Sequence, residues 1–299
     1  MTEMLAYING RYVPASQLAI GAEDIGFVQG VSIAERLRTF HGRVFRLPDH
    51  LERLHNSLQV IELDPGLTIV RIGELIEETV ARNVPLLEPG DDMGIALILT
   101  PGMAAERHPT VAIKTYPLPF GQWVSYYDQG QALTETGVRQ VPSSCWPSSL
   151  KCRSRMHYFL ADQRAQHRDP GSRAILLDQE GAVSEASTAN VLYYQRDVGL
   201  VSPPLERILP GVSLSVLAEL AESLGIPFGF RTFGLSELEA ADEILLCSTS
   251  PCVWPVTRLN SQPITPGAAG PMYRQILAAW SELVGLDIVE QARRFGHRR

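Results

Sequence analysis

The chain has 299 residues, of which 45% are hydrophobic and 20% are charged, a composition typical of a soluble globular protein long enough for two domains. Its formal net charge of −7, with no Lys/Arg block, gives no electrostatic basis for binding nucleic acid. The N-terminal residues do not resemble a signal peptide, and no apolar run reaches the about 18–20 residues that a membrane span needs. We therefore expect a cytoplasmic protein with no nucleic-acid or membrane partner.

The first 118 residues alternate strand and helix signals and are expected to form a small α+β domain. Leucines at positions 51, 54 and 58 recur at helical spacing after Pro48, which predicts a helix there. In chain order, the predicted elements are a hairpin at 4–13, strands at 31–40 and 43–47, helices at about 48–61 and 68–83, and strands at 93–100 and 110–116.

A linker is predicted at 119–130, because the segment PLPFGQW (117–123) places two prolines and a glycine between strand-like runs. The residues 131–299 are expected to form a larger domain. Its predicted elements are a strand at 131–141, a helix at 156–167, a hairpin turning at 179–181, a helix at 212–224, a strand from 243 into a Ser/Thr loop, and a helix at 271–284. The last residues, RRFGHRR, are expected to be frayed.

Lysine is scarce in this chain: only Lys114 and Lys151 occur, although Lys and Arg together number 26. A lysine amine can lose its proton and attack a carbonyl, which a guanidinium cannot do. Lys151 stands near Arg153 and Arg155, and nearby positive charge with partial burial lowers the pKa of a lysine. Lys151 is therefore the candidate nucleophile, with arginine-rich coding as the alternative explanation for the scarcity.

The four cysteines (Cys145, Cys152, Cys247 and Cys252) lack the paired spacing of a metal site, and only seven histidines accompany them. We expect free thiols in a reducing cytoplasm and no metal, with a disulfide as the alternative.

Three further segments carry residues suited to one cofactor. Glu185 follows a hairpin, the run ILPGVS (208–213) contains a Gly turn that opens a helix, and Ser248-Thr249-Ser250 ends an apolar strand. Helix N-termini and hydroxyl-rich loops bind phosphate through unpaired N–H groups. A reactive lysine, a carboxylate for a ring nitrogen and a phosphate cup are together the requirements of pyridoxal 5′-phosphate (PLP). Taken singly, each segment has a structural explanation as a turn acid, a helix start or a cap.

The order of these segments resembles the fold type IV PLP enzymes, which include branched-chain amino acid and D-amino-acid aminotransferases, R-selective amine transaminases and aminodeoxychorismate lyases. The resemblance runs from about Ala22 to Val256 and rests on EDIGFVQGVSIAERLRTFHGRVFRLPDHLERL, on LLDQEGAVSEASTANV, ILPGVS and STSPCVWPV, and on Leu160-Ala161 after Lys151. It implies the following roles: Lys151 as the Schiff-base lysine, Glu185 at the pyridine nitrogen, Leu209 under the ring, and Arg53, Val212, Ser213, Ser248 and Thr249 at the phosphate.

The sequence departs from the family pattern where the substrate is recognised. After the lysine, an Asn or Asn-Tyr pair that can reach the cofactor O3′ is replaced by CRSRMHYFL, so that Tyr158 is the only substitute. Family residues near the substrate carboxylate have no counterpart around Ala34 and Ala96. Candidates for carboxylate and substrate binding are Arg38, Arg107 and Ser250, which could equally be ordinary surface or loop residues.

The resemblance thus implies a homodimer of two-domain α/β (α+β) subunits, with a small N-terminal domain, a larger barrel-like C-terminal domain, and PLP in the cleft between them. The expected activity is the exchange of an amino group between an amino acid, branched-chain-like by preference, and a 2-oxo acid. A PLP lyase of the aminodeoxychorismate type remains an alternative, although the segment around Glu35 favours the transaminase. A PLP- or metabolite-binding relative without catalysis is the second alternative.

Overall fold

The computed structural model describes residues 3–105, 108–264 and 267–297. By their contacts, the residues fall into two compact units, one comprising Met1–Leu118 with Leu150–Ser154 and the other Pro119–Ser149 with Arg155–Arg299. No helix in the described residues is long and apolar enough to cross a membrane.

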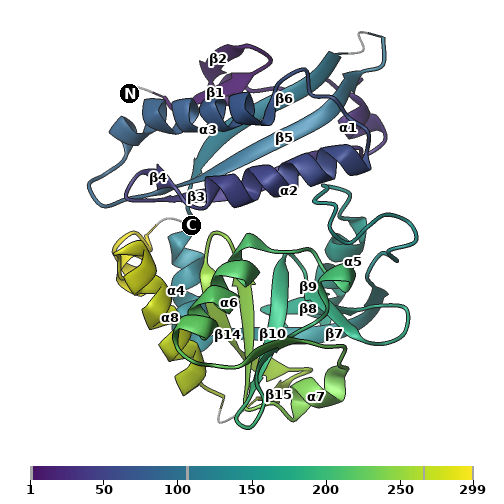
Figure 1. Ribbon diagram of the computed structural model, residues 1–299, viewed down its shortest axis with the longest axis vertical. Coiled ribbons are helices and arrows are strands. Elements are labelled where there is room, and N and C mark those ends of the chain that lie inside the picture. Colours follow the sequence, from purple (N-terminus) through teal and green to yellow (C-terminus); the bar gives the residue numbers. More distant parts are fainter. Residues whose placement is uncertain (1–2, 106–107, 265–266, 298–299) are drawn as a thin grey trace. The chain divides into compact units, whose positions relative to one another are not determined.

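The first unit is a sheet with helices on one face (Figure 1). Its described strands follow the order β2-β1-β6-β5-β3-β4, with antiparallel pairing throughout. The elements are β1 (Leu5–Ile8), β2 (Arg11–Pro14), η1 (Ala15–Gln17), α1 (Ile25–Val28), β3 (Ile33–Phe40), β4 (Arg43–Val44), α2 (Leu47–Val60), α3 (Ile69–Asn83), η2 (Val84–Leu86), β5 (Met93–Met103) and β6 (His108–Pro117).

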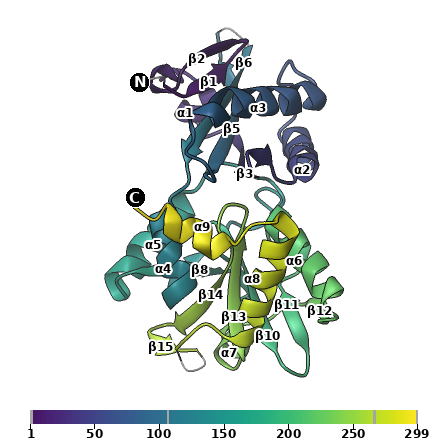
Figure 2. The ribbon, with the colours of Figure 1, turned by 90° about the vertical axis from the view of Figure 1, so that its left-hand side faces the viewer.

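The helices α2 and α3 cover the same face of this sheet (Figures 1 and 2). Leu54 and Leu58 of α2 and Ile72 and Ile76 of α3 are buried in one core with apolar residues of β3 and β5, namely Ile33, Leu37, Met93, Ile95, Leu97 and Leu99. Every second residue of the strands and every third or fourth residue of the helices therefore face one another, and their apolar side chains form one hydrophobic layer.

The second unit contains a closed barrel. Among the described strands, β10-β13-β14-β7-β8-β9 pair in sequence, and the pairing of β9 with β10 closes the ring. Its elements are α4 (Phe120–Gln129), β7 (Gln131–Arg139), α5 (Met156–Arg168), β8 (Ser172–Leu177), β9 (Val183–Ala186), β10 (Ala189–Gln195), β11 (Gly199–Ser202), η3 (Leu205–Arg207), α6 (Val212–Ser223), β12 (Phe228–Phe230), α7 (Leu235–Glu239), β13 (Glu243–Ser248), β14 (Cys252–Leu259), β15 (Gln262–Pro263), α8 (Pro271–Val284) and α9 (Ile288–Arg294). The predicted α+β class with a barrel-like C-terminal region is confirmed.

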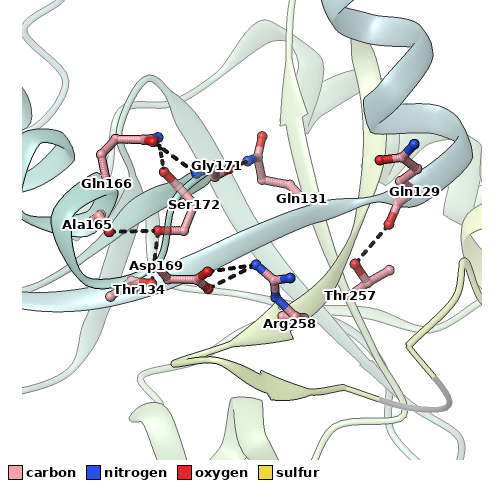
Figure 3. Close-up of polar contacts among 10 residues, drawn as sticks. All are labelled: Gln129, Gln131, Thr134, Ala165, Gln166, Asp169, Gly171, Ser172, Thr257 and Arg258. Carbon is pink, nitrogen blue, oxygen red and sulfur yellow. Dashed lines mark hydrogen bonds and ion pairs between the residues drawn. The ribbon is translucent and has the colours of Figure 1, made fainter.

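Polar contacts brace the barrel where β7, β8 and β14 adjoin (Figure 3). Thr134 of β7 donates to Ser172 of β8 at 3.0 Å between the two hydroxyl oxygens. Arg258 of β14 donates to both carboxylate oxygens of Asp169 at 2.8 and 3.0 Å. The first bond joins β7 to β8, and the second joins β14 to the end of α5, near the point where the β14–β7 register shifts.

Residues 119–130 do not form the expected linker, because 120–129 are helix α4 within the second unit. Pro119 precedes this helix as its N-cap residue, so the prolines mark a helix start rather than a flexible connection. Phe120, Trp123 and Tyr127 are buried, and this helical spacing was the signal that the prolines obscured.

The C-terminal residues also differ from expectation. Asp287 caps α9 by accepting from the amides of Val289 and Glu290, and Phe295 is buried against Phe120, with ring centroids 5.8 Å apart. The prediction of a frayed tail is therefore wrong for 293–297, while 298–299 lie outside the described residues. The predicted hairpin turning at 179–181 is confirmed by the antiparallel pairing of β8 with β9, and β9 also pairs with β10.

Candidate active site

Lys151 is held by the first unit although both flanking segments belong to the second. The amide of Ala34 on β3 donates to the Lys151 carbonyl at 3.0 Å, and the amide of Arg153 donates to the Ser32 carbonyl at 2.9 Å. The Lys151 amide in turn donates to the Ser57 hydroxyl of α2 at 3.3 Å. These bonds fix the backbone of the candidate nucleophile from both sides.

Arg53 on α2 is paired with Glu35 on β3. Its Nε and Nη2 atoms donate to the two Glu35 carboxylate oxygens at 2.8 and 2.7 Å, which is the bidentate geometry of a strong ion pair. Burial alone would raise the pKa of Glu35, but the charge and hydrogen bonds of Arg53, with a hydrogen bond to His50, hold that pKa well below its ordinary value. Glu35 therefore remains an anion that orients Arg53.

His50 completes this cluster, with its Nδ1 atom 2.8 Å from Glu35. Burial lowers the pKa of His50, and the charges of Arg53 and Lys151 lower it further, while Glu35 opposes the change. The buried Nε2 atom has no hydrogen-bond partner among the described residues. A buried polar atom of this kind needs a ligand or water, so the first unit offers a polar group to a bound molecule near Lys151.

Glu185 lies at the centre of a separate cluster in the second unit. Strand pairing places a row of side chains across β8, β9, β10, β13 and β14, namely Leu176, Glu185, Asn190, Cys247 and Val253. One Glu185 oxygen accepts from the Tyr158 hydroxyl at 2.7 Å and from the Gln140 amide at 3.4 Å. The other accepts from the Leu209 amide at 2.6 Å and from Asn190 at 3.3 Å.

The hydrogen bonds to both oxygens fix the plane of the Glu185 carboxylate, which is 5% exposed. Tyr158 is thus placed at Glu185, a contact the sequence did not indicate. Burial raises the pKa of Tyr158 well above its ordinary value, and the Glu185 charge adds to this effect, so the phenol stays a donor at neutral pH.

The run ILPGVS connects Glu185 to the start of α6. Asn190 donates to the Leu209 carbonyl at 2.9 Å, and a Cβ on Gly211 would lie 2.1 Å from the Asn190 oxygen, so only glycine fits there. Helix α6 then begins at Val212 and Ser213, with no side-chain cap on its first amides. This end of a 12-residue helix is suited to a phosphate.

Ser248 ends β13, and Thr249 and Ser250 follow in the turn to β14; all three are partly buried. Ser248 follows Cys247, which is paired with Asn190, so this turn adjoins the Glu185 row. Burial raises the pKa of Cys247 to about 12, which makes it a packed, protonated thiol rather than a nucleophile.

Of the predicted substrate residues, Ser250 lies in the turn beside the Glu185 row, whereas Arg38 belongs to neither cluster. Arg38 is fully buried with its guanidinium carbon 4.0 Å from the centre of the Phe40 ring, so it is part of the core in this structure. Arg107 lies outside the described residues. Arg53 and Lys151 are brought together in the first unit, and Glu185, Leu209, Val212, Ser213, Ser248 and Thr249 are brought together in the second.

His50, Gln140 and Asn190 were missed by sequence reasoning. His50 precedes Arg53 by one helical turn, and that spacing could have indicated a shared face. Asn190 pairs with Glu185 across the short turn between β9 and β10, so the small polar run after Glu185 was the local signal. Gln140 is 45 residues from Glu185 in the sequence, and no local pattern indicates that contact.

The model of the family described as Amino-transferase class IV matches residues 32–259. The chain belongs to this family. A class IV aminotransferase exchanges an amino group between an amino acid and a 2-oxo acid, and members of the class use PLP. The resemblance found in the sequence is therefore confirmed.

Similar proteins fall into two groups. The D-alanine aminotransferases of Staphylococcus haemolyticus and Bacillus licheniformis are 28% and 27% identical, over 93% and 92% of this chain and 97% and 95% of their own. Among solved structures, the branched-chain aminotransferase of Thermoproteus uzoniensis with norvaline has a TM-score of 0.83 at 26% identity, covering 95% of this chain and 96% of that one. The Escherichia coli branched-chain enzyme has a TM-score of 0.85 at 21% identity, covering 95% of each chain, and supports the fold.

Proposed function

We propose that this aminotransferase uses PLP held by Lys151 through its amine, by Glu185 at the ring nitrogen, and by Arg53, Ser248, Thr249 and the amides of Val212 and Ser213 at the phosphate. Leu209 would lie under the ring. The observation that carries the proposal is Glu185, a buried carboxylate oriented on both oxygens and joined directly to the loop that opens α6.

The residues fit the cofactor chemically. A pyridine nitrogen that must stay protonated needs a fixed anion, which Glu185 supplies, and a phosphate needs unpaired amides and a guanidinium. His50, with its unsatisfied Nε2, adds a polar atom close to the arginine.

PLP, when bound, withdraws electrons from the substrate α-carbon and so makes its proton removable. Lys151 would take that proton from Cα as a general base and return it, as a general acid, to the C4′ carbon of the cofactor. Glu185 would keep the ring nitrogen protonated, and Tyr158 and the Leu209 amide would keep Glu185 in position. Glu35 would hold the Arg53 fork ready for the phosphate.

Several finer features belong to this proposal. We infer a homodimer and a cytoplasmic location, supported by the enzyme class and by cysteines that are all free. A branched-chain amino acid is the substrate favoured by the solved neighbours, whereas the curated relatives named above are D-alanine enzymes. The named relatives are all aminotransferases, which disfavours the lyase alternative.

The test is a half-reaction on purified protein loaded with PLP. Amino donors of both hands, including L-leucine, L-valine and D-alanine, should discharge the visible absorbance of the bound cofactor and release a 2-oxo acid. Borohydride reduction followed by peptide mapping should label Lys151 and leave Lys114 unlabelled. PLP retention with no response to any donor would identify a binding protein, and pyruvate release from aminodeoxychorismate would identify a lyase.

A further inference from the structure

The first sheet has a second face, opposite α2 and α3, that carries a concentration of cations. We define this second face by two rows of paired residues. One row is Arg36, Ala96 and Lys114, and the other is Arg38, Gly94 and Tyr116, on β3, β5 and β6 respectively. Directly opposed residues in an antiparallel pair project from the same side, so each row forms one strip across the sheet.

Arg36 is positioned by an aromatic support. A Cβ on Gly94 would lie 2.2 Å from the Tyr116 ring, so the ring lies across the glycine, where any other residue would displace it. The Arg36 guanidinium carbon is 4.9 Å from the centre of that ring. A cation held over an aromatic ring loses motion, and the fork of N–H donors of a guanidinium matches a planar anion.

The charge on the second face is one-sided. Glu35 is the only acidic residue of β3, β5 and β6, and it belongs to the opposite face, where it is paired with Arg53. Arg36 and Lys114 are exposed, and neither forms an ion pair with any residue that the structure describes. In a chain of net charge −7, two such cations in one row attract an anion.

The row also adjoins the candidate nucleophile. The amide of Ala34 donates to the Lys151 carbonyl, and the Ala34 side chain projects from the same face as that of Arg36. Arg36 follows Ala34 by two residues on β3, which corresponds to roughly 6.6 Å along the strand. Between Arg36 and Lys114 stands Ala96, so no large side chain separates the two cations in the row.

We propose that Arg36, supported by Tyr116, binds the carboxylate of the amino-acid and 2-oxo-acid substrates, and that Lys114 is the second cation of the same site. The inference rests on the proposed function for the identity of the reaction. It assigns to Arg36 the role first considered for Arg38, which is buried over Phe40. It also makes carboxylate-bearing substrates strongly preferred over simple amines.

The test is carboxylate binding without turnover, using 4-methylvaleric acid as the probe and calorimetry on the PLP-loaded protein. Arg36→Gln should weaken binding about tenfold to hundredfold, because a bidentate charge-assisted contact is lost. Arg36→Lys should lie between Gln and wild type, since it keeps the charge but not the fork. Lys114→Gln should weaken binding by a smaller factor.

Arg43→Gln on β4 is the matched control, an exposed arginine on a neighbouring strand whose removal changes net charge equally. It should leave the probe affinity unchanged. In steady-state assays, Arg36→Gln should raise the KM for amino acids while leaving the KM for a carboxylate-free amine within twofold. Melting temperatures confirm that the variants are folded.

Equal affinity in Arg36→Gln and wild type, equal losses in Arg36→Gln and Arg43→Gln, or no probe binding by the wild type would each overturn the assignment. Failure of the proposed function gives a different pattern. In that case borohydride labels no lysine and no donor reacts, whether or not probe affinity depends on Arg36.

Discussion

Two buried glutamates, one in each unit, are held in opposite ways. Glu35 lies on a strand of the first unit and is neutralised by the full charge of Arg53 at 2.7 Å. The hydrogen bonds described for Glu185 come from neutral donors, a phenol, two amide side chains and a backbone amide. The bidentate ion pair fixes both the charge and the position of the Glu35 carboxylate, whereas the described hydrogen bonds of Glu185 fix the position of its carboxylate from four neutral groups.

The same contrast extends to the surrounding residues. In the first unit the candidate residues carry or accept charge, namely Lys151, Arg53 and His50. In the second unit the candidate residues are oriented by the strand pairing around Glu185 and by the tight run at Gly211. Substitutions at five positions break or sharpen this comparison.

The largest effect is expected at Lys151. Lys151→Ala should reduce turnover by several orders of magnitude, because the amine that holds the cofactor and moves the proton is lost. Lys151→Arg should fail as badly, since a guanidinium does not deprotonate in proteins. Single-turnover kinetics measures both. An active Lys151→Arg enzyme would show that positive charge, rather than amine chemistry, is what this position supplies.

Glu35→Gln should act on stability. It leaves Arg53 buried without its counterion, and breaking a buried pair in this way costs about 3–5 kcal/mol. Denaturant unfolding at pH 7 measures the loss. An unfolding free energy within about 1 kcal/mol of wild type would show that the pair contributes little.

The pH dependence of stability gives a second reading of the same pair. The pKa of Glu35 is lowered in the folded protein, so its stabilisation is fully present above the unfolded pKa of about 4.3 and is lost as pH falls towards the folded value. Glu35→Gln should therefore flatten the acid side of the stability profile.

Glu185→Gln should act on catalysis instead. The neutral amide cannot hold a proton on the ring nitrogen, so kcat should fall by about a hundredfold with KM little changed, as expected for an interaction made in the transition state. Its melting temperature should stay within a few degrees of wild type. If the Glu185→Gln variant kept the wild-type kcat, Glu185 would have only a structural role in the barrel.

Arg53→Ala should weaken PLP retention about tenfold to hundredfold through loss of a charge-assisted phosphate contact. Because this variant also leaves Glu35 without its partner, the double variant Glu35→Gln/Arg53→Ala is the matched control. The double variant should regain stability but not retention, measured by equilibrium dialysis. Recovery of both would place Arg53 in a structural role only.

The smallest effect is expected for Tyr158→Phe, because Gln140 still contacts the same Glu185 oxygen. Loss of one hydrogen bond predicts a decrease in kcat of roughly twofold to tenfold. Tyr193→Phe serves as control, since Tyr193 is a buried tyrosine of the barrel whose hydroxyl contacts Arg231. Equal decreases in both variants would point to general loosening of the barrel.

Local patterns predicted most of the elements correctly, because amphipathic periodicity and turn residues act over a few positions. Helix α4 was missed because the prolines before Phe120 are strong breakers, although they stand before the helix and not within it. The ILPGVS run was recognisable as a candidate phosphate loop, because the glycine that its turn needs lies within the run itself. Two partners of Glu185 were not, since Gln140 and Tyr158 are 45 and 27 residues distant in the sequence and reach Glu185 only through the tertiary fold.

The placement of Leu150–Ser154 in the first unit has a consequence for biosynthesis. The backbone groups of Ser32 and Ala34 on β3 are paired by residues made more than a hundred positions later. While the ribosome adds residues at about 5–20 per second, this stretch of strand remains an uncovered edge for several seconds, in the state most open to mispairing with another chain. An expression fragment that stops at Leu118 would keep that exposed edge permanently.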